Sequence, residues 1–221
     1  EPSAFTWSKH TGLPEQFEVE HLRAYLWHPY GYSETTSVVE VDFAGRSAKL
    51  FPVPHMAMVK ARLEGSLQFL DEEGEWALGE DGYVYLWPMD NTHPDDIMVV
   101  AVASPRLFDV AGSSADPAHV VKDITFTGLS LVGSGALKNF DSQWASRINS
   151  QPMANGAWVN TREAMVRLEN ATGIVVDGCR LLAAGSSAVW MEHFVQGSRV
   201  VNSWIQDVGF CGVHINGWDM G

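Results

Sequence analysis

The stretch Ala188-Val189-Trp190-Met191-Glu192-His193 decides the fold prediction, because two other stretches of the chain align with it. Residues 164–170, with the sequence AMVRLEN, precede it, and residues 212–217, with the sequence GVHING, follow it. One aligned column holds Val166, Val189 and Val213, and a second holds Leu168, Met191 and Ile215. The constant spacing within these columns indicates a repeat architecture in which equivalent residues stack on one another.

A second set of residues supports the same period. Three pairs share one separation in the sequence: Leu181 with Ile205, Gly185 with Gly209, and Val189 with Val213. An earlier stretch, residues 123–131, matches at about twice that period. Short β-branched segments separated by Asn, Asp and Gly turn residues fill each repeat. We therefore predict an all-β fold in which residues 118–221 form the first coils, of about 24 residues each, of a right-handed parallel β-helix.

The predicted coils share one buried core, because alternate side chains of a strand point to opposite faces. The inward positions are expected to be Phe126, Leu131, Val166, Leu168, Val176, Leu181, Val189, Met191, Ile205, Val213 and Ile215. A long polar segment, residues 133–160, interrupts the repeats. We expect it to leave the helix wall as a loop and to fold over the wall that carries Trp190, since loops of this length are usually functional.

Residues 1–117 have a different hydrophobic pattern and are expected to form a separate β-rich region with hairpins. Alternating segments such as Val38–Phe43 and Tyr83–Trp87, which end at turn residues, are typical of antiparallel strands. A short helix is predicted over residues 54–70, where Met56, Val59, Leu63 and Leu67 recur at helical spacing. The Gly-, Ser-, Ala- and Pro-rich residues 105–117 would join the two regions.

The bulk composition narrows the possible partners. Lys and Arg number 14 against 27 Asp and Glu, so the formal net charge is −13, and nucleic acid is an unfavourable partner. The two cysteines have no metal-type spacing, so no metal and no cofactor are expected. No apolar run reaches the roughly 20 residues of a membrane helix. The chain stops at 217–221 without a capping element, which favours a fragment whose C-terminal end meets further coils or an assembly partner.

Residues 70–88, with the sequence LDEEGEWALGEDGYVYLWP, resemble a stretch that recurs in large right-handed parallel β-helix proteins of the pectin-lyase-like kind. That family includes glycoside hydrolases and many uncharacterised relatives. Ala77 and Gly79 stand where the family usually has Tyr and Asp, and residues 204–213 resemble its strand, Gly turn and next strand. The resemblance implies a carbohydrate-active, extracellular or secreted protein that acts on a polysaccharide, although such folds host hydrolases, lyases and structural proteins alike.

The predicted outward positions form two ladders on one wall, about 4.8 Å apart from coil to coil. One ladder is Arg167, Trp190 and His214, and the other is Glu169, Glu192 and Asn216. Glu192 and Glu169 are the candidate catalytic pair, because a retaining glycosidase needs two carboxylates roughly 5 Å apart. The candidate substrate-binding residues are Arg167, Trp190, His214, Asn216 and Asp219, with Asp207, His193 and Asp141 as alternative site residues.

Three functional interpretations follow from this wall. The first is a polysaccharide glycoside hydrolase with a groove along the parallel sheet. The second is a non-catalytic extracellular structural or glycan-binding module, in which Arg167 neutralises the two stacked glutamates. The third is a polysaccharide lyase, in which His214 abstracts a proton next to a uronate carboxylate that Arg167 neutralises.

Overall fold

The computed structural model describes residues 3–8, 12–29, 33–51, 54, 57–116, 118–136, 140–141 and 163–216. The fold is all-β, as predicted, with antiparallel sheets in one part of the chain and parallel sheets in the other. The chain divides into two compact units between Val99 and Val100, and the short strand β12 (Phe140–Asp141) belongs to the first unit. The sequence had suggested a boundary at residues 117/118, whereas the structure assigns Phe108–Ala111 to the second unit. None of the helices in the described part of the chain has the length and apolar character needed to cross a lipid bilayer.

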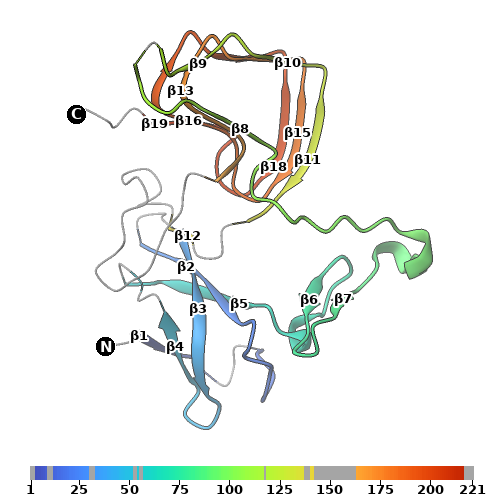
Figure 1. Ribbon diagram of the computed structural model, residues 1–221. Coiled ribbons are helices and arrows are strands. Elements are labelled where there is room, and N and C mark those ends of the chain that lie inside the picture. The colour runs from blue at the N-terminus through green and yellow to red at the C-terminus, as the bar shows by residue number, and fades with distance from the viewer. Residues whose placement is uncertain are drawn as a thin grey trace. The chain divides into compact units, whose positions relative to one another are not determined.

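The N-terminal unit is built on an antiparallel sheet with the strand order β1-β4-β3-β2-β5, and β12 pairs with β3 (Figure 1). The strands are β1 (Ser3–Thr6), β2 (Arg23–Trp27), β3 (Ser33–Asp42), β4 (Ser47–Phe51) and β5 (Lys60–Glu64). Alternate residues of β2 are buried, as expected for a sheet with one face on a core. That core contains Phe17, Leu22, Ala24, Leu26, Val38, Ala48 and Leu50.

The helix predicted over residues 54–70 is wrong. Its described part contains the strand β5 and the single 3₁₀ turn η1 (Leu67–Phe69). Helical spacing of four apolar residues did not decide the structure, because β5 obtains backbone partners along the whole length of β2. A hairpin of β6 (Trp76–Leu78) and β7 (Val84–Leu86) follows, and then the short turns η2 (Met89–Asn91) and η3 (Pro94–Asp96).

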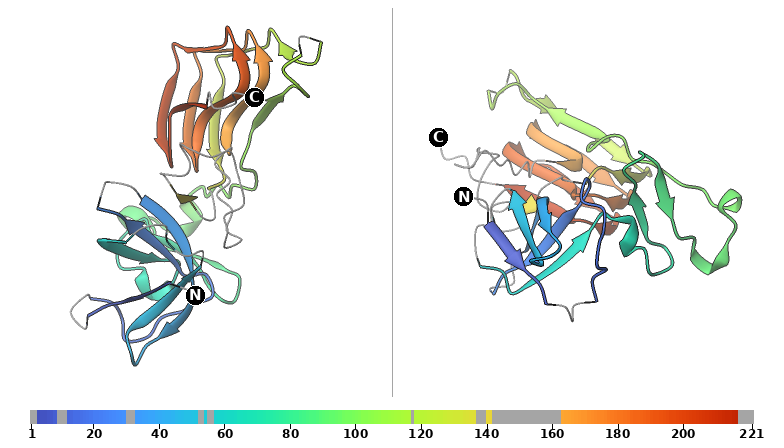
Figure 2. Two further views of the ribbon diagram at one scale, coloured as in Figure 1. Left: turned by 90° about the vertical axis from the view of Figure 1, so that its left-hand side faces the viewer. Right: turned by 90° about the horizontal axis from the view of Figure 1, so that it is seen from below.

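The C-terminal unit consists of three parallel sheets through which the chain passes in turn (Figures 1 and 2). One sheet has the order β10-β14-β17, with β10 at Thr125–Thr127, β14 at Val175–Asp177 and β17 at Arg199–Val201. The next has the order β11-β15-β18, with β11 at Ser130–Ser134, β15 at Arg180–Ala184 and β18 at Trp204–Val208. Each repeat thus contributes one strand to each sheet.

The third sheet, which we call the acidic wall, has the order β8-β13-β16-β19. Its strands are β8 (Phe108–Ala111), β13 (Ala164–Thr172), β16 (Ser187–Gln196) and β19 (Val213–Asn216), and β9 (Val121–Lys122) also pairs with β13. The predicted register is confirmed, because Val166 pairs with Val189 and Val189 with Val213 in parallel. Leu181 pairs with Leu131 on one side and with Ile205 on the other.

The turns explain why the repeat keeps its length. Left-handed backbone recurs at stacked positions, for example at Gly178 with φ 63° and Asn202 with φ 52°, which lie one repeat apart. Gly185 and Gly209 stack even more closely, since a Cβ atom on Gly209 would lie 2.4 Å from the carbonyl oxygen of Gly185. Only glycine permits that approach, so this column of the repeat has a steric cause.

The predicted core is largely confirmed. Seven of its members are buried in one cluster with Phe126 and Ile205 packed against it: Leu131, Val166, Leu168, Val176, Leu181, Val189 and Met191. The prediction is wrong for Val213 and Ile215, which are 41% and 73% exposed. Their strand β19 has β16 as its only strand partner in the described part of the chain, so nothing described there covers these side chains. The loop predicted over residues 133–160 lies mostly outside the described residues.

Candidate functional site

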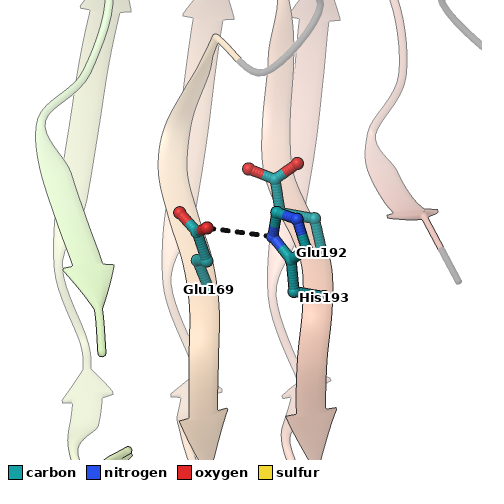
Figure 3. A group of neighbouring side chains, drawn as sticks. All are labelled: Glu169, Glu192 and His193. Atoms are coloured by element: carbon teal, nitrogen blue, oxygen red, sulfur yellow. Dashed lines mark ion pairs between the residues drawn. The ribbon is translucent and has the colours of Figure 1, made fainter. Parts of the chain in front are cut away.

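The acidic wall brings the predicted ladders together. Arg167 pairs with Trp190 and Trp190 with His214, while Glu169 pairs with Glu192 and Glu192 with Asn216. The two glutamates therefore project from neighbouring parallel strands, β13 and β16 (Figure 3). Asn216 is placed by its backbone only, and Asp219 lies outside the described residues.

Arg167 is the centre of the site, because its guanidinium bonds three carboxylates. Its Nε donates to Oε1 of Glu192 at 3.0 Å, and Nη2 lies 2.9 Å from the same oxygen. Nη1 donates to Oδ1 of Asp109 at 3.0 Å, and Nη2 also donates to Oε2 of Glu169. Bonds between a guanidinium and carboxylates are among the strongest that side chains make. The two candidate catalytic residues are thus ion-paired to one cation.

A second arginine extends the network. Arg106 donates from Nη1 to Oδ2 of Asp109 at 2.8 Å, and from Nε and Nη2 to the two carboxylate oxygens of Glu163 at 2.8 and 2.9 Å. Sequence reasoning missed Asp109, Arg106 and Glu163. The available signal was the apolar-charged-apolar pattern at 108–110, which pairs with the like pattern at 166–168 but lies more than two repeat periods before it.

His193 completes the group of residues that could hold a metal ion. Its Nδ1 lies 2.9 Å from Oε1 of Glu169, and Figure 3 shows the imidazole beside that carboxylate. Glu169, Glu192 and His193 each offer a ligand atom, and these atoms lie within 4.8 Å of one another. Carboxylate and imidazole are suitable donors for a divalent ion. However, the guanidinium of Arg167 already bonds both carboxylates, so a cation would have to compete with Arg167.

The wall is not the open sugar platform that the sequence suggested. Trp190 has no exposed surface, Glu192 is 1% exposed and Arg167 is 8% exposed. Trp190 stacks on His214 with ring centroids 3.9 Å apart and planes 5° from parallel. Val189 belongs to the core cluster and Trp190 does not, so the strand register is as predicted. Trp190 is nevertheless buried, so the outward face of the sheet is itself covered at this position. Alternation fixes the face on which a side chain lies, but not what covers that face.

Burial and ion pairing shift two ionisation equilibria at the wall. Burial lowers the pKa of Arg167, but hydrogen bonding to Glu192 and the charges of Glu169, Glu192 and Asp109 outweigh it, so the net pKa is raised. Burial lowers the pKa of His214, and the charge of Glu192 opposes this only in part. Arg167 therefore stays a cation, and the neutral form of His214 is favoured.

Two of the three alternative site residues, Asp207 and Asp141, lie in other sheets. Asp207 is on β18 in a different sheet, has φ 55°, and accepts a hydrogen bond from Nε2 of Gln206 at 3.1 Å. Asp141 is on β12, which pairs with β3 of the N-terminal unit. Of the alternatives, only His193 joins the cluster around Arg167.

Comparison with models of protein families, with curated proteins and with solved structures found no match, so no family is assigned to the chain.

Proposed function

We propose that this chain is a non-catalytic, extracellular glycan-binding protein built on the first coils of a right-handed parallel β-helix. The β-helix is supported by the three parallel sheets and by a strand register that repeats with the period of the sequence. A glycan as partner is supported by the resemblance of residues 70–88 to β-helix glycoside hydrolases and by the charge of −13, which disfavours polyanionic ligands.

The observation that carries the non-catalytic assignment is the set of bonds that Arg167 makes to Glu169 and Glu192. A glycosidase acid must hold a proton, and its partner must reach the anomeric carbon of the sugar. The guanidinium of Arg167 bonds an oxygen of each carboxylate, so neither group is available for these roles while the bonds remain. Glu192 is also 1% exposed, so a sugar ring has no access to it in this arrangement. The network instead stabilises the wall.

A glycoside hydrolase is the second candidate, and one observation favours it. The ligand atoms of Glu169 and Glu192 lie within 4.8 Å of each other, which is close to the separation of about 5 Å in retaining enzymes. The hydrolase requires Arg167 to release one carboxylate and the wall to open. The lyase is less favoured, because Arg167 already bonds three carboxylates and is not available for a uronate.

Binding and turnover measured on the same polysaccharides distinguish these functions. The full chain would be titrated with soluble neutral and anionic polysaccharides while reducing ends and unsaturated products are followed. We expect saturable binding to neutral glycans with neither product. Release of reducing ends would favour the hydrolase, release of unsaturated products would favour the lyase, and absence of binding across the panel would reject glycan recognition.

A further inference from the structure

The N-terminal unit contains a groove of about 1310 Å³, and every residue that lines it belongs to that unit. The groove is formed by β1 and the segment after it, the start of β2, the middle of β3, most of β5, the turn η1, and the strand β6. Pockets for drug-sized ligands measure about 300–1,000 Å³. A groove of this volume therefore suits a chain of several small rings better than a single one.

The groove offers aromatic and apolar surface for such rings. Trp76 lines it, and its side chain is 67% exposed although its backbone is fixed by pairing with Leu86 across the hairpin. Trp7 and Phe69 also line it, and both pack against the core of the unit. An indole face that is positioned by a strand yet open to solvent can pack on the C–H face of a pyranose ring with little ordering cost.

Fixed polar groups lie beside this surface. Glu75 lines the groove, and its Oε2 accepts hydrogen bonds from the backbone N–H groups of Asp71 and Glu72 at 2.8 and 3.1 Å. Ser66 and Gln68, also in the lining, are hydrogen-bonded to each other at 2.6 Å. Carboxylates, amides and hydroxyls of this kind bond sugar hydroxyls, and positions fixed in advance give selectivity.

The charges of the groove select among glycans. The lining carries the acidic residues Glu20, Glu64, Asp71 and Glu75 against the basic residues Arg23 and Arg62. Arg62 is itself paired with Glu64 at 3.2 Å. A uronate chain would meet net repulsion here, whereas a neutral chain would not.

We propose that this groove binds a neutral oligosaccharide of several pyranose rings, with Trp76 as the stacking platform. The inference rests on the proposed glycan-binding function and moves its binding surface from the acidic wall to the N-terminal unit. The wall then has a structural role and the groove the recognition role.

The test is calorimetric titration of the full chain with β-1,4-linked glucose and xylose hexasaccharides and with an α-1,4-linked galacturonate hexasaccharide. Trp76→Ala should weaken binding of a neutral hexasaccharide by at least about tenfold, the effect expected of a central aromatic contact. Trp76→Phe should recover part of the loss. The matched control is Trp204→Ala, since Trp204 is 62% exposed but lies on β18 of the other unit, and its binding should equal that of the unmodified chain. The galacturonate chain should bind more weakly than the neutral ones.

The outcomes separate the two proposals. Neutral glycan binding that survives Trp76→Ala, with the fold retained by circular dichroism, would overturn the groove while leaving glycan binding in place. Absence of binding by the unmodified chain to every hexasaccharide would overturn both. Self-association of the unmodified chain that Trp76→Ala abolishes would assign the groove to a second copy of the chain and would also overturn the inference.

Discussion

Replacing Arg167 with Met removes the cation at the centre of the acidic wall and keeps most of the side-chain volume. Glu192 would then be a carboxylate with 1% exposure that has lost its two contacts with the guanidinium. Its attraction to Arg167 at 3.0 Å corresponds to about 5 kcal/mol at an effective dielectric constant of about 20. Asp109 and Glu169 have side chains 39% and 18% exposed, so water compensates much of their loss. We expect the variant to lose about 3–5 kcal/mol of unfolding free energy, as when one partner of a buried pair is removed.

The assay is urea unfolding of the C-terminal unit. Unfolding is monitored through the reactivity of the Cys179 thiol, which is 1% exposed in the folded chain. A thiol probe in that unit is needed because two units can unfold in separate transitions. The double variant Arg167→Met/Glu192→Gln, which removes the stranded charge, should recover more than half of the loss. Arg199→Met, at an exposed position of β17, is the control and should change stability by less than about 0.5 kcal/mol. If Arg167→Met loses less than about 1 kcal/mol of unfolding free energy, Arg167 is not the residue that stabilises the acidic wall.

Three further variants test the steric basis of the repeat and the stacking of His214 on Trp190. Gly185→Ala should destabilise the C-terminal unit by about 1–3 kcal/mol in the same assay, because its Cβ would lie 2.4–2.6 Å from backbone atoms of residues 134–136. Gly212→Ala, whose nearest contact would be 3.6 Å, should be nearly neutral, and equal effects of the two would contradict the steric explanation. His214 has a pKa lowered by burial from its ordinary 6.5, so the unfolded state binds the proton more readily and stability should fall as pH drops below 6.5. His214→Phe keeps a ring on Trp190 and should reduce this slope between pH 6.5 and the lowered pKa; an unchanged slope would assign the pH dependence to other groups.

The sequence predicted the register of the parallel sheets because stacking repeats the same residue types at a fixed spacing. Val166, Val189 and Val213 occupy one column, and their pairing follows directly from that spacing. The sequence could not predict the exposure of Val213, because exposure depends on which strand lies beside β19 rather than on the repeat. It also could not predict the burial of Trp190, since alternation assigns a face and not its cover.

The stacking of equivalent residues also predicted part of the candidate site. Glu169 and Glu192 are adjacent as expected, and Arg167 is beside them. The third carboxylate, Asp109, lies on β8, which joins the sheet from outside the repeat, so no spacing in the sequence pointed to it. The sequence therefore predicts a binding surface at the wall. The structure shows instead a network of ion pairs in which Asp109 bonds both Arg106 and Arg167.

Whether the acidic wall is structural or catalytic is tested most directly by comparing the full chain with its Glu192→Gln variant on neutral polysaccharides, with binding and reducing-end release measured in the same samples. If the wall is structural and the chain binds without cleaving, both proteins bind with the same affinity and neither releases reducing ends. Reducing-end release by the unmodified chain that falls by several orders of magnitude in Glu192→Gln, with binding retained, would contradict a purely structural role of the wall and identify Glu192 as a catalytic carboxylate.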